Sequence, residues 1–291
     1  MTGQPVLEGP AAPIAYDRVV RLTPLVRRLT QHNEGPFTGP GTNTHLVGSS
    51  SIVILDPGED RDDGHLERIV AAVGSALVTA VIPSHGHPDH WPLAPRLAER
   101  LGAPIAFWGT HPGFRTDRVL ADGDILDAGG VGLEVLYTPG HTADHVSFLL
   151  ATERALFPGD HVMGWATSII APPEGDLTLY LRSLERLIAL PDLEVLYPAH
   201  GTAVTLPYTR MRELHAHREL RTRQALEALG HGESRIMPLV ARIYADVDPR
   251  LHPAAAQSLL AHLLALEGAG KIERVSESAT ASWDEVTWRL R

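Results

Sequence analysis

The sequence predicts an α/β main domain followed by a small winged-helix-like domain. From about Leu46 to Ala203, short apolar runs of strand length alternate with stretches of helical period. Beyond Leu206 the pattern changes to three helices and then two short strands. Since 291 residues are long for one domain and sufficient for two, we place the domains at residues 1–205 and 206–291.

Each predicted strand of the main domain is a short apolar run bounded by turn residues. In chain order these runs are Ser51–Leu55, Leu77–Ile82, Ile105–Trp108, Leu133–Tyr137, Val146–Leu150, Ala155–Phe157 and Glu194–Tyr197. Helices are predicted at Leu66–Val73, at Pro92–Leu101, and from the N-cap Asp176 to a point before Pro191. Strands and helices that alternate in this way are typical of an α/β domain.

The winged-helix-like domain is predicted from helices followed by a hairpin. The helices are expected at His215–Leu229, which Gly230 closes, and at Arg235–Ala245 and Pro253–Leu266. Two strands joined by a polar loop, Lys271–Val275 and Glu285–Leu290, complete it. A unit of this size can bury a modest core of its own.

The composition restricts the chemistry and the environment of the chain. It has no cysteine, so disulfides are excluded and metal ligands must be His, Asp or Glu. Its net charge of −10 gives no general electrostatic attraction to nucleic acid. The first twenty residues lack an apolar signal-peptide core, and no run approaches the ~20 apolar residues of a membrane span. We therefore expect a cytoplasmic protein with no membrane partner.

Potential metal ligands follow four of the apolar strands through short turns that contain Pro or Gly. They are His85, His87, Asp89, His90, His141, Asp160 and His200. We expect one edge of a sheet to bring these imidazoles and carboxylates into one cleft. A single histidine usually lies on the surface, or in the core with its hydrogen bonds made, and several neighbouring histidines can occur in a solvated loop. Neither explanation accounts for the complete set of seven residues.

Seven ligands divide well between two metal ions. His85 and His87 are two residues apart and can share one ion, whereas Asp89 and His90 are turned toward a neighbouring position. Catalytic zinc usually takes three protein ligands and keeps an open position, so two ions with one bridging carboxylate account for the set. Two ions about 3.5–4 Å apart form a known hydrolytic arrangement. Imidazole and carboxylate ligands suit Zn first, with Mn or Fe as alternatives.

The pattern H-x-H-x-D-H followed by distant His, Asp and His resembles the metallo-β-lactamase superfamily, over about Leu46–Ala203. The resemblance implies an αββα sandwich in which Asp160 bridges two metal ions. It implies that His85, His87 and His141 bind one ion and that Asp89, His90 and His200 bind the other. Asp56 matches the family's early aspartate, which supports a metal-bound histidine; a turn former before Pro57-Gly58 is the alternative.

A narrower resemblance is to the lactamase-β-like protein 2 subfamily, whose members carry a C-terminal winged-helix-like domain. It rests on Gly35–Thr38, on Gly41–Thr44 and on the His217-Arg218 pair. The chain departs from that pattern at Trp91–Ala94 and at Met163–Thr167. Both segments are expected near the cleft, so they put the subfamily's substrate in doubt.

Several further residues are candidates for contact with substrate. Asp89 is expected to orient the attacking water and to pass a proton to the leaving group. Five others are candidate substrate contacts, and all but Trp165 have a structural role as the alternative: Asn43, Thr44, His145, His161 and Trp165. For the histidines that alternative is a structural hydrogen bond, and for Asn43 and Thr44 it is shaping a loop.

Three functions are compatible with these residues. The subfamily implies a phosphodiesterase that cuts single-stranded RNA. The alternative is hydrolysis of a small ester, thioester or lactone, with the C-terminal domain as a lid or as a contact in a homo-oligomer. A non-enzyme that binds DNA or a partner through that domain is the third, and the complete ligand set argues against it. One cluster of arginines lies after the main domain: Arg210, Arg212, Arg218, Arg221 and Arg223. The cluster supports an RNA substrate if it contacts phosphate, and a solvated helix face is the other explanation.

Overall fold

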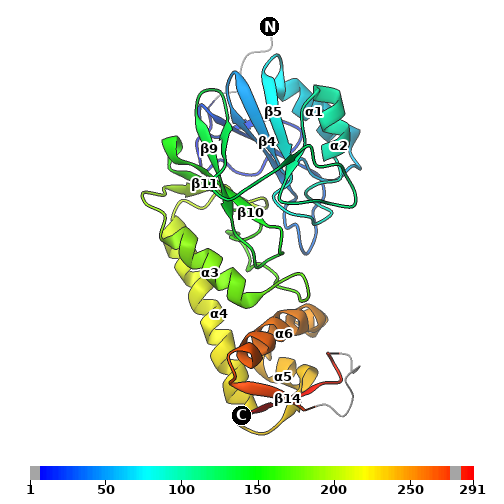
Figure 1. The fold of residues 1–291 in the computed structure, drawn as a ribbon, viewed down its shortest axis with the longest axis vertical. Coiled ribbons are helices and arrows are strands. Elements are labelled where there is room, and N and C mark those ends of the chain that lie inside the picture. The colour runs from blue at the N-terminus through cyan, green and yellow to red at the C-terminus, as the bar shows by residue number, and fades with distance from the viewer. Residues whose placement is uncertain (1–6, 276–282) are drawn as a thin grey trace. The chain divides into compact units, whose positions relative to one another are not determined.

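The computed structural model describes residues 7–275 and 283–291 (Figure 1). The chain forms two compact units, which we describe separately. The first unit comprises Met1–Thr138, Asp144–Thr167 and Ala189–Arg210. The second comprises Pro139–Ala143, Ser168–Ile188 and Met211–Arg291. These units group residues by spatial contact, and the predicted domain boundary between residues 205 and 206 stays a prediction.

The first unit contains two five-stranded sheets. The first sheet follows chain order: β1 (Val20–Arg21), β2 (Val26–Thr30), β3 (Asn43–Gly48), β4 (Ser51–Leu55) and β5 (Leu77–Ile82). Its first four strands are antiparallel neighbours, and β5 lies parallel to β4. A parallel neighbour requires a crossover, which α1 (Asp63–Val73) supplies. The β3–β4 pairing sets His45 opposite Leu55.

The second sheet has the order β12-β11-β10-β9-β8. Its strands are β8 (Ile125–Asp127), β9 (Gly132–Tyr137), β10 (Val146–Leu150), β11 (Ala155–Phe157) and β12 (Val195–Leu196). Since β10 is antiparallel to both β9 and β11, and β12 is parallel to β11, three strands run in one direction: β9, β11 and β12. The chain therefore leaves these three strands at the same edge. A 3₁₀ turn, η1 (Ala151–Glu153), joins β10 to β11.

The two sheets pack face to face through one hydrophobic core, and helices cover the other face of the first sheet. The core between the sheets includes Val53 from β4, Phe148 from β10 and Phe157 from β11. On the outer face, Ile69 of α1 and Leu97 of α2 (Ala94–Leu101) pack against the sheet. Two short strands, β6 (Ala106–Phe107) and β7 (Arg118–Val119), form a separate parallel pair. A parallel bridge between Val81 and Ile105 places the start of this pair beside β5.

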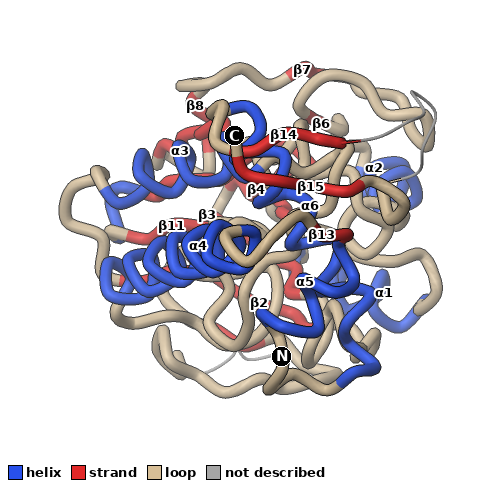
Figure 2. The backbone as a smooth tube through the Cα atoms, turned by 90° about the horizontal axis from the view of Figure 1, so that it is seen from below, coloured by secondary structure: helices blue, strands red, loops and turns tan. Residues whose placement is uncertain are grey.

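The second unit is mainly helical. Its helices are α3 (Leu177–Ile188), α4 (Pro207–Leu229, from Met211 onward), α5 (Ile236–Ile243) and α6 (His252–Gly268), with a 3₁₀ turn η2 (Pro249–Leu251). A three-stranded sheet has the order β13 (Ser234–Arg235), β15 (Thr287–Leu290) and β14 (Ile272–Val275). Figure 2 shows β14 and β15 side by side. The core is centred on Trp288, with Leu259 and Leu263 of α6.

The structure confirms the predicted α/β class with its C-terminal winged helix domain, and it corrects several details. The strands β1, β2 and β3 were not predicted, so Asn43 and Thr44 lie in a strand and not in a loop. Helix α4 begins at Pro207, eight residues before the predicted start, because its first turns are polar and carry little apolar period. The expectation of one sheet edge was wrong: β5 belongs to the first sheet, and the strands before the other ligands belong to the second.

Two other expectations depend on which residues the structure describes. The polar loop expected before the last strand falls largely on residues 276–282, outside the described residues. None of the helices within residues 7–275 and 283–291 is long and apolar enough to cross a membrane.

His45 is a titratable side chain in the core between the two sheets. It is 2% exposed, and its ring lies 5.2 Å from the ring of Phe157. Burial, helped by the charge of Arg28, lowers the pKa of His45 to about 3. The folded protein therefore keeps this imidazole neutral in mild acid.

We expect the stability of the metal-free protein to depend on the pH through His45. Unfolded histidine takes up a proton below about pH 6.5, so the unfolded state binds more protons in acid. The contribution is complete above that pH and is lost as the pH falls through 6.5 toward 3, by up to about 1.4 kcal/mol per pH unit. Urea unfolding between about pH 7 and pH 5 measures the slope. His45→Gln should flatten it, and His231→Gln, at an exposed position, should not. Equal slopes in the two variants would contradict this assignment.

Candidate metal centre

Two backbone connections bring the ends of the two sheets together. The N–H of Asn43, the first residue of β3, donates to the carbonyl of Ala199 at 2.7 Å, and Thr42 forms a β-bridge with His200. The N–H of Val146 at the start of β10 donates to the carbonyl of Ser84 at 2.9 Å. The N–H of Ala199 also donates to the carbonyl of Gly159 at 3.2 Å, so the loops that follow β11 and β12 are adjacent.

The loop after β5 is a compact turn. The N–H of His90 donates to the carbonyl of His87 at 3.0 Å, and the carbonyl of His90 accepts the N–H of Gly58 at 3.1 Å. His85 and His90 are fully buried, whereas His87 and Asp89 are partly exposed. This turn directs four potential ligands to one side, two of them screened from water.

The seven predicted ligands lie close together, in three groups whose candidate ligand atoms are within 4.8 Å of one another. The groups are His85 with His87 and His141; His85 with His90 and Asp160; and Asp89 with His90 and His200. The Nε2 of His85 is 2.9 Å from the Nδ1 of His87. The grouping follows the division that the resemblance implies, and the role of each residue as a ligand stays a prediction.

Asp160 lies between two imidazoles. Its Oδ1 is 3.3 Å from the Nε2 of His200, and its Oδ2 is 3.7 Å from the Nε2 of His90. Asp89 contacts the same two rings, with Oδ2 at 3.1 Å from His200 and 3.3 Å from His90. Both of these rings belong to the group of Asp89, and Asp160 also lies with His85 and His90 in a group of its own, so its carboxylate lies at the junction of the two predicted ion sites.

Acceptors on the far side of the rings orient two of the imidazoles. The Nδ1 of His200 is 3.2 Å from the carbonyl of Gly41, and the Nδ1 of His141 is 2.6 Å from the carbonyl of Ile169. The Nδ1 of His90 faces Oδ1 of Asp56 at 3.3 Å without a hydrogen bond. An acceptor at Nδ1 holds the proton there and leaves the Nε2 lone pair for a metal ion. The Nε2 atoms of His90 and His200 face the carboxylates of Asp89 and Asp160.

The balance of burial and charge favours a cation at this site. Burial raises the pKa of Asp89, but the charge of His90 and a hydrogen bond with His200 outweigh it and hold that pKa well below its ordinary value. Burial lowers the pKa of His200, and Asp160 together with Asp89 raises it to about 10. Both effects reflect ionised carboxylates that attract positive charge. A divalent ion can occupy the place of the imidazole protons, so the residues fit a metal pair.

Asp56 supports the centre from behind. Its Oδ1 accepts the N–H of Ser84 at 2.7 Å and faces His90, and its φ of 49° is in the left-handed region. The hydroxyl of Thr44 donates to the carbonyl of Asp56 at 2.8 Å. Asp56 therefore forms the turn before Pro57 and also lies against His90. The role as a turn former and the role as a support for a histidine are compatible in this geometry.

His145 is a second supporting residue. Its Nε2 accepts the N–H of Asp160 at 3.1 Å, so its Nδ1 carries the proton and donates to the hydroxyl of Thr138 at 2.9 Å. Gly159, at a φ of 53°, allows this approach, because a Cβ there would lie 2.6 Å from that Nε2. These contacts fit the structural alternative for His145. His161 is buried 5.7 Å from it, between ring centroids, and its substrate role stays a prediction.

Asn43 supports the loop of His200. Its side-chain amide donates to the carbonyls of Pro198 and Gly201, at 3.1 and 2.8 Å, and its carbonyl oxygen accepts the hydroxyl of Thr30. Asn43 is 1% exposed, and these bonds account for its polar atoms. Sequence reasoning missed Thr138 and Gly41, which support the centre. A Thr before Pro-Gly and a Gly among loop glycines carry no chemical signal of their own.

The arginines of α4 are used inside the protein. Arg210 donates to the carbonyls of Met163 and Ala166 at 2.8 and 2.7 Å. Arg218, which is buried, donates to the carbonyl of Ser168. Arg221 donates to the carbonyl of Ile243 at 2.9 Å. These contacts correct the expectation of a solvated helix face for three of the five arginines, and Arg212 and Arg223 are the exposed ones.

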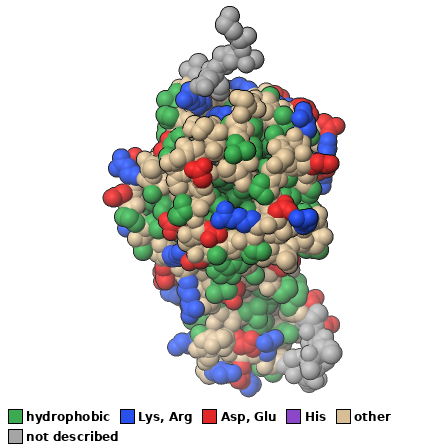
Figure 3. All heavy atoms as spheres, turned by 45° about the horizontal axis from the view of Figure 1, so that its top comes forward, with side chains coloured by type: hydrophobic (Ala, Val, Ile, Leu, Met, Phe, Trp, Pro, Cys, Tyr) green, Lys and Arg blue, Asp and Glu red, His purple; other side chains and the backbone are tan. Residues whose placement is uncertain are grey.

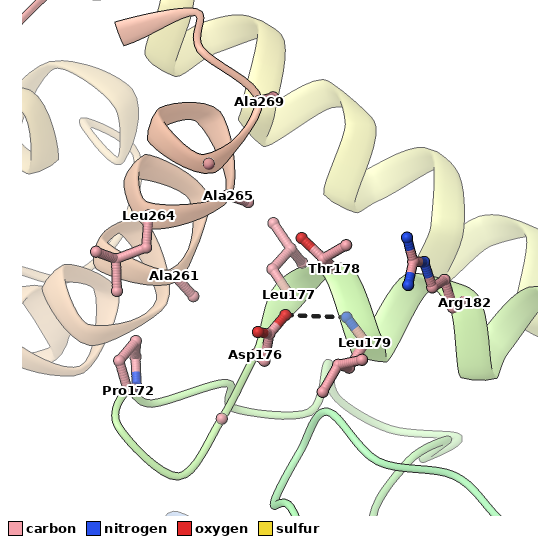
Figure 4. A pocket seen from close by; sticks show the side chains of 12 residues that line it. Pro172, Asp176, Leu177, Thr178, Leu179, Arg182, Ala261, Leu264, Ala265 and Ala269 are labelled. Carbon is pink, nitrogen blue, oxygen red and sulfur yellow. Dashed lines mark hydrogen bonds between the residues drawn. The ribbon is translucent and has the colours of Figure 1, made fainter. Parts of the chain in front are cut away.

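The second unit contains a cavity of about 560 Å³ between α3 and α6. Figure 4 shows small apolar residues of α6 on one side, including Ala261 and Ala265, and the first turn of α3 on the other. The side chain of Asp176 caps α3 by accepting the N–H of Leu179 at 2.9 Å. None of the lining residues is a histidine, so the cavity lacks the ligand chemistry of the metal centre.

Comparisons with known proteins agree with this site and fold. Residues 108–200 match the metallo-beta-lactamase superfamily, and residues 236–283 match the beta-lactamase associated winged helix domain. The chain is 30% identical to the atrochrysone carboxyl ACP thioesterase of Aspergillus chevalieri, over 91% of this chain and 88% of that protein. It is 31% identical to the beta-lactamase-like protein 2 homolog of Drosophila melanogaster, over 90% and 94% of the two chains.

A solved structure shares the fold over nearly the whole chain. The crystal structure of a beta-lactamase domain protein from Burkholderia ambifaria superposes with a TM-score of 0.81 at 22% identity, over 96% of this chain and 95% of that one. Since both kinds of similarity extend through the C-terminal domain, the chain belongs as a whole to the metallo-β-lactamase superfamily of hydrolases.

Proposed function

We propose that this protein is a dinuclear metal hydrolase that cleaves a thioester or ester bond of a small molecule. The observation that carries the proposal is the ligand cluster around Asp160, in a chain that is similar from end to end to a named thioesterase. The sequence left hydrolysis of a small ester, thioester or lactone open as the alternative to cleavage of RNA, and the named relatives favour this alternative. The products of the proposed reaction are a carboxylic acid and a thiol or an alcohol.

Two ions account for the ligands. Members of the superfamily typically bind two metal ions, and the cluster fits that number. Imidazole and carboxylate donors without cysteine suit Zn, with Mn and Fe as the alternatives. When bound, such a pair supplies Lewis-acid polarisation of a carbonyl and water that is activated at neutral pH.

Asp89 is the residue we assign to proton movement. Its side chain is 19% exposed, whereas that of Asp160 is 9% exposed, so Asp89 is the carboxylate that water and substrate reach more readily. Ionised by its imidazole neighbours, it can accept a proton from the attacking water and direct that water at the carbonyl. A thiolate leaves readily because its conjugate acid has a pKa near 8.5, so a thioester makes little demand on a proton donor.

The surface argues against an RNA substrate. Arg210, Arg218 and Arg221 donate to internal carbonyls and are not a free phosphate-binding row. On the face shown in Figure 3, acidic and basic side chains are interspersed and do not gather into one basic surface. A nuclease gains most of its affinity from such a surface. A homo-oligomer and a cytoplasmic location stay predictions.

We expect the zinc-loaded protein to release thiol from acyl thioesters of N-acetylcysteamine. The chain has no cysteine, so a thiol reagent reports turnover without background from the protein. Asp89→Asn should retain metal and lower kcat by about 10²-fold or more, since it loses the general base. Asp246→Asn, at an exposed position in the second unit, is the matched control and should behave as wild type.

The same preparation should be given labelled single-stranded RNA. RNA cleavage that Asp160→Ala abolishes, with no thiol release from any thioester, would overturn the proposal in favour of a nuclease. Full thioesterase activity in Asp89→Asn would leave the hydrolase in place and remove Asp89 from proton transfer.

Asp56 should contribute to metal affinity without binding metal. Asp56→Ala removes the carboxylate that faces Nδ1 of His90 at 3.3 Å. Losing an outer partner of this kind typically lowers metal affinity 10–100-fold, so we expect a loss of about that size for one of the two ions. Equilibrium dialysis with metal analysis measures it. Asp60→Ala, at an exposed position that pairs with Arg96, is the control. Unchanged affinity for both ions in Asp56→Ala would show that Asp56 only forms the turn.

A further inference from the structure

Trp165 is a large apolar side chain that lies partly in water beside the metal centre. It follows β11 in a loop of the first unit, and 46% of it is exposed. An indole ring is among the costliest side chains to leave in water, and it usually lies buried or at an interface. Its position therefore calls for an explanation.

Glycines on two loops form the surface on which the indole rests. A Cβ at Gly39 would lie 2.7 Å from Cε2 of Trp165, and a Cβ at Gly201 would lie 2.8 Å from its Cδ1. Both glycines have positive φ, 55° and 83°. Any other residue at either position would displace the ring, so the backbone itself holds the indole against the two loops.

Arg210 holds the backbone on both sides of Trp165. Its Nε donates to the carbonyl of Met163 and its Nη2 to the carbonyl of Ala166. One planar guanidinium thus fixes the loop at two points that flank the indole. The ring is exposed and yet oriented in advance, which lowers the entropy lost when a ligand binds to it.

The same two loops hold a candidate metal ligand. Gly201 directly follows His200, and the carbonyl of Gly41, two residues after Gly39, accepts from Nδ1 of His200 at 3.2 Å. The indole therefore contacts the residue next to His200. A group stacked on the indole would therefore lie next to the loop that carries His200.

A second aromatic side chain lies at the tip of the loop that contains Gly39. Two backbone hydrogen bonds between Gly35 and Gly39, at 2.8 and 3.2 Å, close a turn with Phe37 near its apex. Phe37 is 64% exposed. Two exposed aromatic rings on loops that share Gly39 give the neighbourhood of His200 an apolar side.

We propose that Trp165, with Phe37, forms the acyl subsite of the hydrolase and selects a flat, aromatic acyl group. This inference rests on the proposed function and names its substrate class. The face of an indole stacks best on another ring, and its loop is held in place, so a planar aroyl group gains more from it than a short aliphatic one. Hydrolysis then releases an aromatic carboxylic acid and the free thiol.

The first measurement compares the kcat/KM for the 2-naphthoyl and acetyl thioesters of N-acetylcysteamine. We expect wild type to prefer the naphthoyl substrate. The ratio of the two values should fall by about tenfold or more in Trp165→Ala, because both the ring stacking and the apolar contact are lost. Trp165→Phe should keep most of the preference. Trp283→Ala, which removes a tryptophan 37% exposed in the second unit, is the matched control.

The second measurement needs no turnover. The amide analogue of the substrate, N-acetyl-N′-(2-naphthoyl)ethylenediamine, has NH in place of the thioester sulfur. It should bind the zinc-loaded wild type, and bind zinc-loaded Trp165→Ala at least about fivefold more weakly, by calorimetry. The subsite would be overturned if wild type and Trp165→Ala had the same ratio of kcat/KM for the two thioesters and bound the amide equally well. A change of oligomeric state in Trp165→Ala without a change in either readout would also overturn it, in favour of a subunit contact. If no thioester is cleaved but the amide binds through Trp165, the proposed function fails and the subsite stands.

Discussion

The structure depends on a carboxylate that is held in the interior between imidazoles. Asp160 is 6% exposed, and an ionised carboxylate at such a depth is very costly unless opposite charge and hydrogen bonds compensate for it. His90 and His200 supply the charge on its two oxygens. Much of the local architecture serves to hold those three side chains in register.

The compensation extends outward through backbone and side-chain contacts. His145 holds the backbone of Asp160, Asp56 faces the far nitrogen of His90, and the carbonyl of Gly41 faces that of His200. Each contact ties a ligand to a segment that borders a different strand: His145 directly precedes β10, Asp56 directly follows β4, and Gly41 lies two residues before β3. Strands packed through a common core move little, so the ligand atoms stay within the few tenths of an ångström that metal coordination requires.

The two kinds of cationic side chain in the chain have separate uses. Histidines gather at the strand ends, where neutral or charged imidazoles can exchange protons for metal ions. Arginines of α4 cross-link the backbone: Arg210 holds the loop of Trp165, and Arg218 holds the segment at Ser168. The planar guanidinium with several donors suits that role better than a lysine ammonium would. An arginine cluster in a sequence is thus poor evidence for nucleic acid until its partners are known.

The sequence by itself determined the strands that precede the predicted ligands and which seven residues gather at their ends. Apolar runs such as Val146–Leu150 and the motif from His85 to His90 are local signals, which depend on burial and on the chemistry of single residues. Only the tertiary structure decided that the ligands come from two sheets, because strand pairing joins residues far apart in the chain. It also decided that Thr138, Gly41 and Asn43 support the centre and that Trp165 lies beside His200. Those contacts depend on backbone carbonyls and on the missing Cβ of two glycines, and neither leaves a chemical mark in the sequence.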